Sequence, residues 1–299
     1  MVTSSIPQKR IWFITGSSKG LGRALAETVL ERGEIVVLTA RNPEQIEDLA
    51  VSFPNQTLAV QLDVTKPEEI GEAVKQAITN FGRIDVLVNN AGYGIFGAIE
   101  EVSNEEVRRQ FETNFFAVLE VLRTVLPHMR KQRSGHIMNI SSVGGFVSYA
   151  GTGIYNGTKF AIEGISEALA QEVTPLGIKI TIVEPGAFRT DFVKRSLVIS
   201  DMQIDDYETV IGAMRQDARD ILNLKLEFNE PGDPKKAALA MMKAVDSDHP
   251  PLRLVLGEDA ISAINTKLHS VKAELDAWIE VSVDTTAEKG ERKKVWESS

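Results

Sequence analysis

Short runs of β-branched and aliphatic residues alternate with longer amphipathic stretches along most of the 299-residue chain, and this alternation is the strongest constraint on its fold. Each short run is bounded by Gly, Pro or Asn, as buried parallel strands are. The predicted strands are 11–15, 35–40, 57–62, 86–88, 136–140 and 178–183, and the predicted helices between them are 20–31, 67–80, 105–132 and 155–173. The order predicts βαβ units and hence an α/β fold, a three-layer, doubly wound (Rossmann) parallel sheet.

The last third of the chain follows a different pattern. Residues 191–230 lack a clear strand and are predicted to form a helical flap that contacts substrate. Asp233 followed by Pro234 is a helix start, because Asp caps free amides and Pro suits the first helical position, so a helix over 234–245 follows. Apolar residues spaced three and four apart predict another helix, which either covers the core or contacts a second subunit: Ile261, Ile264, Leu268, Val271, Leu275 and Trp278.

We expect a single domain over 1–299. Its parts would be a cofactor and catalytic core (9–190), the substrate flap (191–230), the C-terminal helices (231–282) and a solvated tail (283–299).

Composition excludes several classes of function. Acidic residues number 42 against 33 basic ones, a net charge of −9, which disfavours nucleic acid and anionic membranes as partners. The chain has no Cys, so thiolate catalysis and zinc–thiolate sites are excluded, and its four His show no ligand-like pairing, so no metal is expected. Without a secretory signal or an apolar run of membrane-spanning length, we expect a cytoplasmic protein.

Three glycines follow the first predicted strand, at Gly16, Gly20 and Gly22, just where a helix begins. Such a turn lets a ligand approach the backbone closely, and the helix N-terminus favours an anion such as the pyrophosphate of a dinucleotide. The spacing is not G-x-G-x-x-G, and a tight turn without ligand would also need Gly. The residues expected to contact the dinucleotide in this turn are Gly16, Ser18, Lys19, Gly20 and Leu21.

Arg41 stands at the end of the second predicted strand, where an acidic residue would hold the ribose 2′-hydroxyl of NAD. Its forked cation suits the 2′-phosphate of NADP instead, and Lys19 adds a second positive charge. We therefore predict NADP (NADPH) as the cofactor. The alternative is two surface cations without a ligand.

The glycine turn, Asn89-Asn-Ala-Gly92 and Tyr155-Asn-Gly-Thr-Lys159 occur in an order that resembles the short-chain dehydrogenase/reductase family, of the TGxxxGxG and YxxxK type. The resemblance covers about 9–190, and the C-terminal part resembles the 17β-hydroxysteroid-dehydrogenase-like branch. It implies further cofactor contacts from Asp63, Val64, Asn90, Ala91, Gly92, Tyr155, Lys159, Pro185, Gly186 and Thr190. Asn89 is expected to brace the central strands.

Tyr155 and Lys159 are four residues apart and so share one face of a helix. An ammonium beside a phenol, together with an oxidised nicotinamide, would lower the phenol's pKa from about 10 and allow proton exchange with a substrate oxygen. The resemblance implies that Ser142, rather than its neighbour Ser141, hydrogen-bonds that oxygen. It also implies that Asn114 positions a water for proton relay to Lys159.

These features predict an NADP-dependent oxidoreductase that interconverts a ketone or aldehyde and an alcohol, chiefly by carbonyl reduction. An aromatic set near the catalytic loops indicates a medium or large hydrophobic substrate: Phe96, Phe146, Tyr149, Phe188 and Phe192. Two alternatives are a non-catalytic NADP-binding redox sensor and an epimerase or dehydratase of the related extended family. The resemblance implies a homodimer or homotetramer built on the helices that carry Asn114 and Tyr155, with a seam of Phe115, Phe116, Val118 and Leu122.

Overall fold

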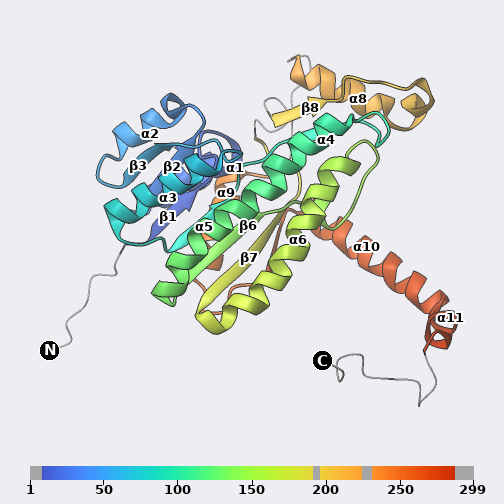
Figure 1. Ribbon diagram of the computed structural model, residues 1–299. Helices are drawn as coiled ribbons and strands as arrows, with labels where there is room; N and C mark the ends of the chain where they lie inside the picture. Colours follow the sequence, from blue (N-terminus) through green and yellow to red (C-terminus); the bar gives the residue numbers. More distant parts are fainter. Residues whose placement is uncertain (1–8, 191–195, 224–230, 287–299) are drawn as a thin grey trace.

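The computed structural model describes residues 9–190, 196–223 and 231–286. Seven parallel strands form one sheet in the order β3-β2-β1-β4-β6-β7-β9, with helices on both faces, which confirms the predicted doubly wound α/β fold (Figure 1). The strands are β1 (Ile11–Ile14), β2 (Ile35–Ala40), β3 (Thr57–Gln61), β4 (Val86–Asn89), β6 (Gly135–Ile140), β7 (Ile178–Pro185) and β9 (Arg253–Leu256).

Alternate side chains of the strands supply two separate cores, because successive residues of a strand point to opposite faces of the sheet. Trp12 and Ile14 of β1 pack on one face under α1 (Gly20–Glu31) and α9 (Pro234–Asp246). Ile11 and Phe13 pack on the other face under α3 (Pro67–Phe81), α5 (Ala117–Gln132) and α6 (Gly153–Val173). Burial on both faces explains why these strands read as continuous apolar runs.

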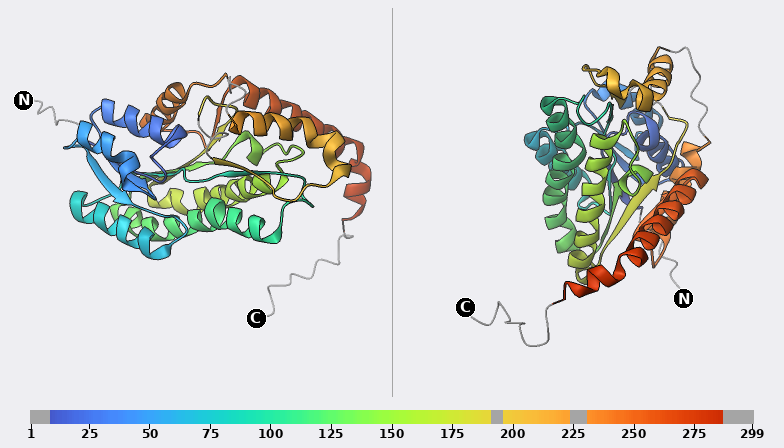
Figure 2. Two further views of the ribbon diagram at one scale, coloured as in Figure 1. Left: turned by 90° about the horizontal axis from the view of Figure 1, so that it is seen from above. Right: turned by 90° about the vertical axis from the view of Figure 1, so that its right-hand side faces the viewer.

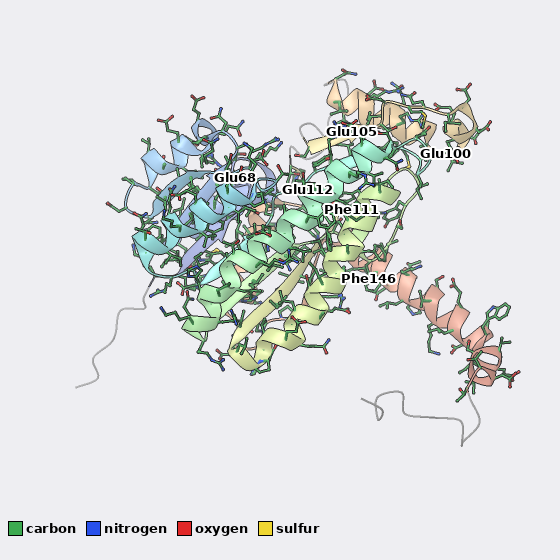
Figure 3. All side chains as sticks on the ribbon, viewed as in Figure 1. Glu68, Glu100, Glu105, Phe111, Glu112 and Phe146 are labelled. Carbon is green, nitrogen blue, oxygen red and sulfur yellow. The ribbon has the colours of Figure 1, made fainter. Side chains whose placement is uncertain are left out.

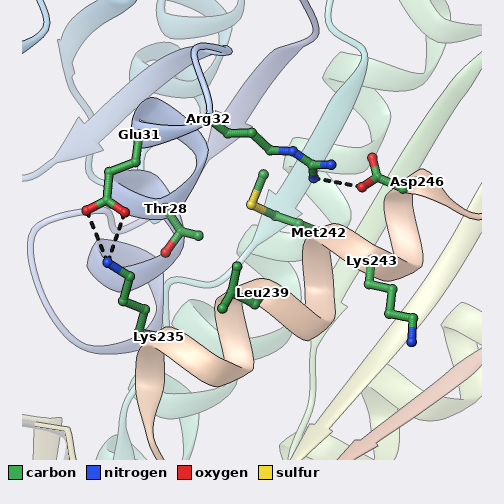
Figure 4. A pocket seen from close by; sticks show the side chains of 8 residues that line it. All are labelled: Thr28, Glu31, Arg32, Lys235, Leu239, Met242, Lys243 and Asp246. Atoms are coloured by element: carbon green, nitrogen blue, oxygen red, sulfur yellow. Dashed lines mark hydrogen bonds and ion pairs between the residues drawn. The ribbon is translucent and has the colours of Figure 1, made fainter.

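The Asp233 cap is confirmed, since its Oδ1 accepts hydrogen bonds from the backbone N–H groups of Lys235 (2.8 Å) and Lys236 (3.3 Å). The α9 helix then lies along α1, and a shallow groove runs between them (Figure 4). Ion pairs bridge this groove from Lys235 to Glu31 (2.9 Å) and from Arg32 to Asp246 (2.7 Å). It lies on the face of the sheet opposite α6, away from Tyr155 and Lys159.

The predicted helix over 105–132 is divided into three parts. They are α4 (Asn104–Phe111), a π-helical turn η2 (Glu112–Phe116) and α5. Ser103 caps α4 and Glu106 returns the bond to the Ser103 N–H (2.8 Å), which is a capping box. The π-helical turn carries Asn114, so the break falls on a predicted site residue.

Three of the described strands were not predicted: β9 at one edge of the main sheet, and the two short strands β5 and β8. Within the predicted flap, β8 (Leu197–Ile199) pairs in parallel with β5 (Gly94–Phe96), so the expectation that 191–230 has no strand is wrong. Three-residue strands that pair across a hundred residues leave almost no periodic signal. The flap continues as α8 (Glu208–Leu222) and lies at the end of the molecule where α4 and α6 begin (Figure 1).

The last described elements are α10 (Glu258–Ala277) and α11 (Ile279–Asp284), and α10 runs away from the body of the molecule (Figures 1 and 2). The start of the tail predicted for 283–299 overlaps α11, and residues 287–299 lie outside the described residues. The remaining helical elements are η1 (Pro43–Ile46), α2 (Glu47–Ser52), η3 (Val143–Gly145), η4 (Thr174–Leu176) and η5 (Asp205–Tyr207). None of the described helices is long and apolar enough to cross a membrane.

Candidate active site

The glycine turn after β1 is folded tightly against the end of β4. Gly16 (φ +70°) and Gly20 (φ +60°) adopt left-handed backbone conformations, which residues with a Cβ rarely tolerate. A Cβ on Gly22 would lie 2.3 Å from Nδ2 of Asn90 and 2.5 Å from the carbonyl oxygen of Gly16. No side chain fits at position 22 without displacing the turn.

Asn90 shapes this turn from the side. Its Nδ2 donates to the carbonyl oxygens of Thr15 (2.9 Å) and Gly16 (3.0 Å). The Thr15 hydroxyl in turn accepts from the backbone N–H groups of Asn90 (2.9 Å) and Ala91 (3.1 Å). Asn89 braces the neighbouring strands as predicted, donating from Nδ2 to Oδ1 of Asn139 on β6 (2.8 Å).

A dinucleotide fits this end of the sheet on two observations. The α1 helix begins at the turn without a side-chain cap, so its first-turn amides are not satisfied by the usual Ser, Thr or Asp oxygen. The glycines also leave the backbone open to close approach. Half-buried Ser18, Lys19 and Leu21 lie in the same turn, and a Cβ on Gly20 would come within 3.9 Å of Thr190.

Arg41 and Asp63 follow two adjacent strands, β2 and β3. Arg41 is exposed, whereas Asp63 and Val64 are half-buried. Burial opposes ionisation of Asp63, but hydrogen bonds from the N–H and hydroxyl of Thr65 and the charges of Arg41 and Lys66 lower its pKa overall. Arg41, predicted to bind the 2′-phosphate, is therefore close enough to Asp63, predicted to contact the adenine, for its charge to affect that carboxylate.

Pro185 and Gly186 end β7 at the same edge of the sheet. Asp259, near the start of α10, accepts a hydrogen bond from the Ala187 N–H (2.7 Å). A Cβ on Gly186 would lie 2.2 Å from that carboxylate. The first turn of α10 thus holds the loop that the sequence predicts beside the nicotinamide.

Ser142, Tyr155 and Lys159 are brought together where β6 ends and α6 begins. Lys159 is buried, donates from Nζ to the carbonyl oxygen of Ile140 (2.8 Å) and lies 5.7 Å from the centre of the Tyr155 ring. Ser142 follows β6 and shares a hydrogen bond with Tyr155. Its hydroxyl also accepts from the Gly144 N–H (3.0 Å), which fixes its position.

Burial controls the ionisation of the two reactive groups. It raises the pKa of Tyr155, and the hydrogen bond with Ser142 only opposes that shift. It lowers the pKa of Lys159 to about 8, while the Glu163 carboxylate acts in the opposite direction. The expected lowering of the Tyr155 pKa is not seen in the protein without its cofactor. The cost of desolvating the phenolate outweighs the hydrogen bond with Ser142, so the pKa rises. Tyr155 is a neutral phenol at physiological pH.

Asn114 connects the two halves of this site. Its Oδ1 accepts from the Tyr93 N–H (3.1 Å), and its Nδ2 donates to the Tyr93 carbonyl (2.8 Å) and the Thr158 hydroxyl (3.1 Å). These bonds join the backbone just after Gly92 to the residue before Lys159. These bonds fix the side chain of Asn114, and its role in positioning a water for proton relay to Lys159 stays a prediction.

A buried carboxylate pair beneath the site was not predicted. Glu163, one turn after Lys159, lies beside Glu184 of β7, and Arg253 of β9 contacts both, at 3.3 and 3.1 Å. Burial and the neighbouring Glu163 raise the pKa of Glu184 to about 7, against the opposing charge of Arg253. The spacing of four residues between Lys159 and Glu163 could have indicated that the two share a helix face. No sequence pattern indicated that Glu163 would lie beside Glu184.

The predicted substrate residues that the structure describes lie in different surroundings. Phe96 is buried with Ala98 and Ile211 beneath the flap, and Phe188 packs against the core under α1 and α9, so both are packing residues. Phe146 is half-buried in the loop after Ser142, near the start of α10 (Figure 3), and Tyr149 in the same loop is 45% exposed. Phe192 lies outside the described residues.

A second set of buried charges secures the flap. Both carboxylate oxygens of Glu101 accept from Arg215 of α8 (2.7 Å each), and they also accept from the N–H groups of Ala98 (2.8 Å) and Ile204 (2.9 Å). The pair joins α8 to the loop between β5 and α4. Neither residue was singled out from the sequence, because their separation of 114 positions carries no local pattern.

Comparison with known proteins identifies the class. The profile of the short chain dehydrogenase family matches residues 10–198, which include the glycine turn and the Ser142, Tyr155 and Lys159 cluster. The chain belongs to this family. It is therefore an NAD(P)-dependent dehydrogenase/reductase, an oxidoreductase that acts on small molecules.

Relatives are similar along nearly the whole chain. Oxidoreductase BOA17 of Botryotinia fuckeliana is 40% identical over 275 residues, which cover 92% of this chain and 98% of that protein. The 3-ketodihydrosphingosine reductase of Bacteroides thetaiotaomicron is 40% identical over 251 residues, 84% of this chain and 88% of that protein. The solved structure of a short-chain dehydrogenase from Streptomyces avermitilis is 43% identical, with a TM-score of 0.86 over 94% of this chain and all of that one.

Solved neighbours contain either cofactor. ElxO is bound to NADP (26% identity, TM-score 0.69, covering 85% of this chain and 100% of that one). The 3-ketoacyl-(acyl-carrier-protein) reductase of Brucella melitensis is complexed with NADH (25% identity, TM-score 0.68, covering 82% and 96%). The cofactor is thus a nicotinamide dinucleotide. Among the described residues, no group of three or more His, Asp or Glu could hold a metal ion.

Proposed function

We propose that the protein reduces a ketone or aldehyde of medium or large hydrophobic character to the alcohol, with NADPH as the cofactor. The observation that carries the proposal is the half-buried, neutral phenol of Tyr155 between Ser142 and Lys159. A protonated phenol is the form that a carbonyl reduction needs, because the reduced oxygen must receive a proton.

Each residue of the site has a distinct role in the proposed reduction. When bound, the dinucleotide supplies the hydride to the carbonyl carbon. Tyr155 donates its proton to the carbonyl oxygen, and Ser142, oriented by the Gly144 amide, donates a hydrogen bond to the same oxygen. Lys159 stabilises the phenolate that remains, and Asn114 holds the segment after Gly92 against α6.

The dinucleotide would be held by the turn and by the strand ends. The α1 amides and the residues Gly16, Ser18, Lys19, Gly20 and Leu21 would hold the pyrophosphate. Asp63 and Val64 would contact the adenine, Asn90, Ala91 and Gly92 the adenosine side, and Pro185, Gly186 and Thr190 the nicotinamide. Exposed Arg41 supports NADP over NAD, because a cation after β2 attracts a 2′-phosphate while no carboxylate occupies that position to hold a 2′-hydroxyl.

The hydrophobic substrate rests on Phe146 and Tyr149, which follow Ser142 in the loop that precedes α6. A relative named for reducing 3-ketodihydrosphingosine is 40% identical and supports a ketone as the substrate class. The cytoplasmic location and a homodimer or homotetramer also remain part of the proposal.

NADPH consumption against a panel of bulky ketones and aldehydes tests the reaction, with Tyr155→Phe as the matched variant. Loss of the hydroxyl removes the proton donor and should lower turnover by about 10² to 10⁴-fold while NADPH affinity is kept. Equal turnover in the two proteins would remove Tyr155 as proton donor.

The cofactor preference has its own test. Arg41→Asp should reverse the ratio of kcat/KM for NADPH over NADH, since the carboxylate repels a 2′-phosphate and accepts from a 2′-hydroxyl. An unchanged ratio would contradict the assignment of Arg41.

A further inference from the structure

The far part of α10 makes no packing contact that buries it. Every residue from Asn265 to Thr286 is exposed, and in Figure 3 the helix extends from the body with its side chains in solvent. The large apolar residues on it are 37 to 64% exposed. Isolated helices of this length are marginal in water, so a helix that keeps an apolar stripe needs a surface that covers the stripe.

The stripe has the spacing of a coiled-coil seam. Ile261, Leu268 and Leu275 recur every seven residues, and Val271 and Trp278 fall three after the last two. These are the a and d positions of a heptad repeat, whose seam fits another helix of the same kind. Ile264, the remaining d position, is already buried against the body.

We infer that α10 pairs in antiparallel fashion with α10 of a second copy of this chain, so that the helix is a subunit interface. In an antiparallel pair the a residues of one helix meet the d residues of the other. Leu268 would then face Val271 of the second copy, and Ile261 would face its Trp278. Two-fold symmetry repeats each contact, which doubles the apolar area that two copies bury.

Charges beside the seam favour this orientation. Lys267 and Glu274 both occupy the g position of the repeat, and g positions face each other in an antiparallel pair. Lys267 of each copy would therefore lie near Glu274 of the other, two opposite-charge contacts. A parallel pair would instead place Lys267 opposite Lys272 of the second copy, because g then faces e, and like charges there repel.

The seam predicted on the helices that carry Asn114 and Tyr155 is less complete. Val118 and Leu122 are buried in this chain's own core and Phe115 packs against it, which leaves only Phe116 exposed, at 50%. A contact through that face would not depend on Lys267 or Leu268. The two surfaces can therefore be distinguished by mutation.

Mass measured by light scattering on the full chain tests the pairing. The wild-type protein should be a dimer or tetramer, and Leu268→Glu should halve that mass at the same concentration by weakening the contact about 100-fold or more. Lys267→Glu should weaken it too, and Lys267→Glu combined with Glu274→Lys should restore it. Ala273→Glu, on the opposite face of α10, is the matched control and should leave the mass unchanged.

A cross-link decides the orientation, because the chain has no Cys of its own. Leu268→Cys and Val271→Cys proteins should form a disulfide when mixed and oxidised, but neither should cross-link efficiently alone. A monomeric wild-type protein, a mass unaffected by Leu268→Glu, or efficient cross-linking of Leu268→Cys with itself would each overturn the inference. Sedimentation of a monomeric protein with phosphatidylcholine or phosphatidylserine vesicles would assign the stripe to a lipid surface instead. NADPH binding, which uses none of these residues, reports that each variant is folded.

Discussion

The ammonium group of Lys159 donates a hydrogen bond to the carbonyl oxygen of Ile140, the last residue of β6, at 2.8 Å. This bond joins α6 to the strand end that leads into Ser142, so one buried cation fixes the distance between the two segments that carry the reacting hydroxyls. The lysine is buried and its pKa is about 8, so its charge depends on pH within the working range of an enzyme.

Lys159→Met should lower kcat for carbonyl reduction by about 100-fold or more, because the phenolate left after proton transfer loses its cation. In the wild-type enzyme Lys159 is charged below its pKa of about 8 and neutral above it, so kcat/KM should fall as pH rises through that value. The pH profile of NADPH consumption checks this. If the Met variant showed the same decline, another group would be responsible for it.

Gly22→Ala should weaken cofactor binding at least about tenfold and lower the free energy of unfolding by about 1 to 3 kcal/mol. The new Cβ would lie 2.5 Å from the Gly16 carbonyl oxygen, which is backbone and can move only with the turn. Gly71→Ala is the matched control, since nothing lies within 4 Å of its Cβ on α3. That variant should bind NADPH normally and be slightly more stable. Fluorescence titration and thermal unfolding measure the two effects.

Glu184→Gln should change how stability depends on pH. The Glu184 pKa is about 7 in the folded protein against 4.5 for an ordinary Glu side chain, so the folded state binds the proton more tightly. The contribution of Glu184 to the free energy of unfolding is therefore fully present below pH about 4.5 and is lost as pH rises through about 7. The Gln variant should lose much of that decline, a difference on the order of 1 to 3 kcal/mol at neutral pH.

Urea unfolding across this pH range provides the measurement. Glu167→Gln is the control, because that carboxylate is exposed although it pairs with the same Arg253. Parallel stability curves for the wild-type and Glu184→Gln proteins would contradict the raised pKa of Glu184.

Arg215→Met should loosen the flap, because it leaves the Glu101 carboxylate buried without its bidentate partner. Breaking a buried ion pair by removing one partner costs about 3 to 5 kcal/mol. Since the pair joins α8 to the loop before α4, we expect a higher KM for the carbonyl substrate and unchanged affinity for NADPH. Steady-state kinetics separate the two constants.

Glu100→Gln is the matched control for the flap. This carboxylate accepts a hydrogen bond from the Tyr207 hydroxyl (2.6 Å) at the exposed surface, where such a contact contributes little. A loss of NADPH affinity in Arg215→Met as large as the rise in KM would show that the pair supports the whole domain rather than the flap.

Most of the sheet could be predicted from the sequence because its signals are local. Each central strand is an apolar run with its own boundaries, and the α1 and α9 helices begin where the glycine turn and the Asp233–Pro234 pair indicate. The pairing of Tyr155 with Lys159 follows from helical periodicity alone. That Ser142 lies beside them was implied only by the family resemblance. The spacing of residues along the chain could not show it, because the contact depends on the tertiary structure.

Burial and long-range contact were decided by the tertiary structure. Whether Phe96 lines a pocket or fills a core depends on β8, which lies a hundred positions away, and the ionisation of Tyr155 depends on how completely the fold removes it from water. The raised pKa of Glu184 likewise depends on tertiary structure, because Glu163 of α6 and Glu184 of β7 are brought together only by the fold. Local sequence patterns determine the helical and strand periodicities and the turns. Desolvation and charge pairing arise only when segments distant in the sequence meet in the fold, and they set the pKa values of the site residues.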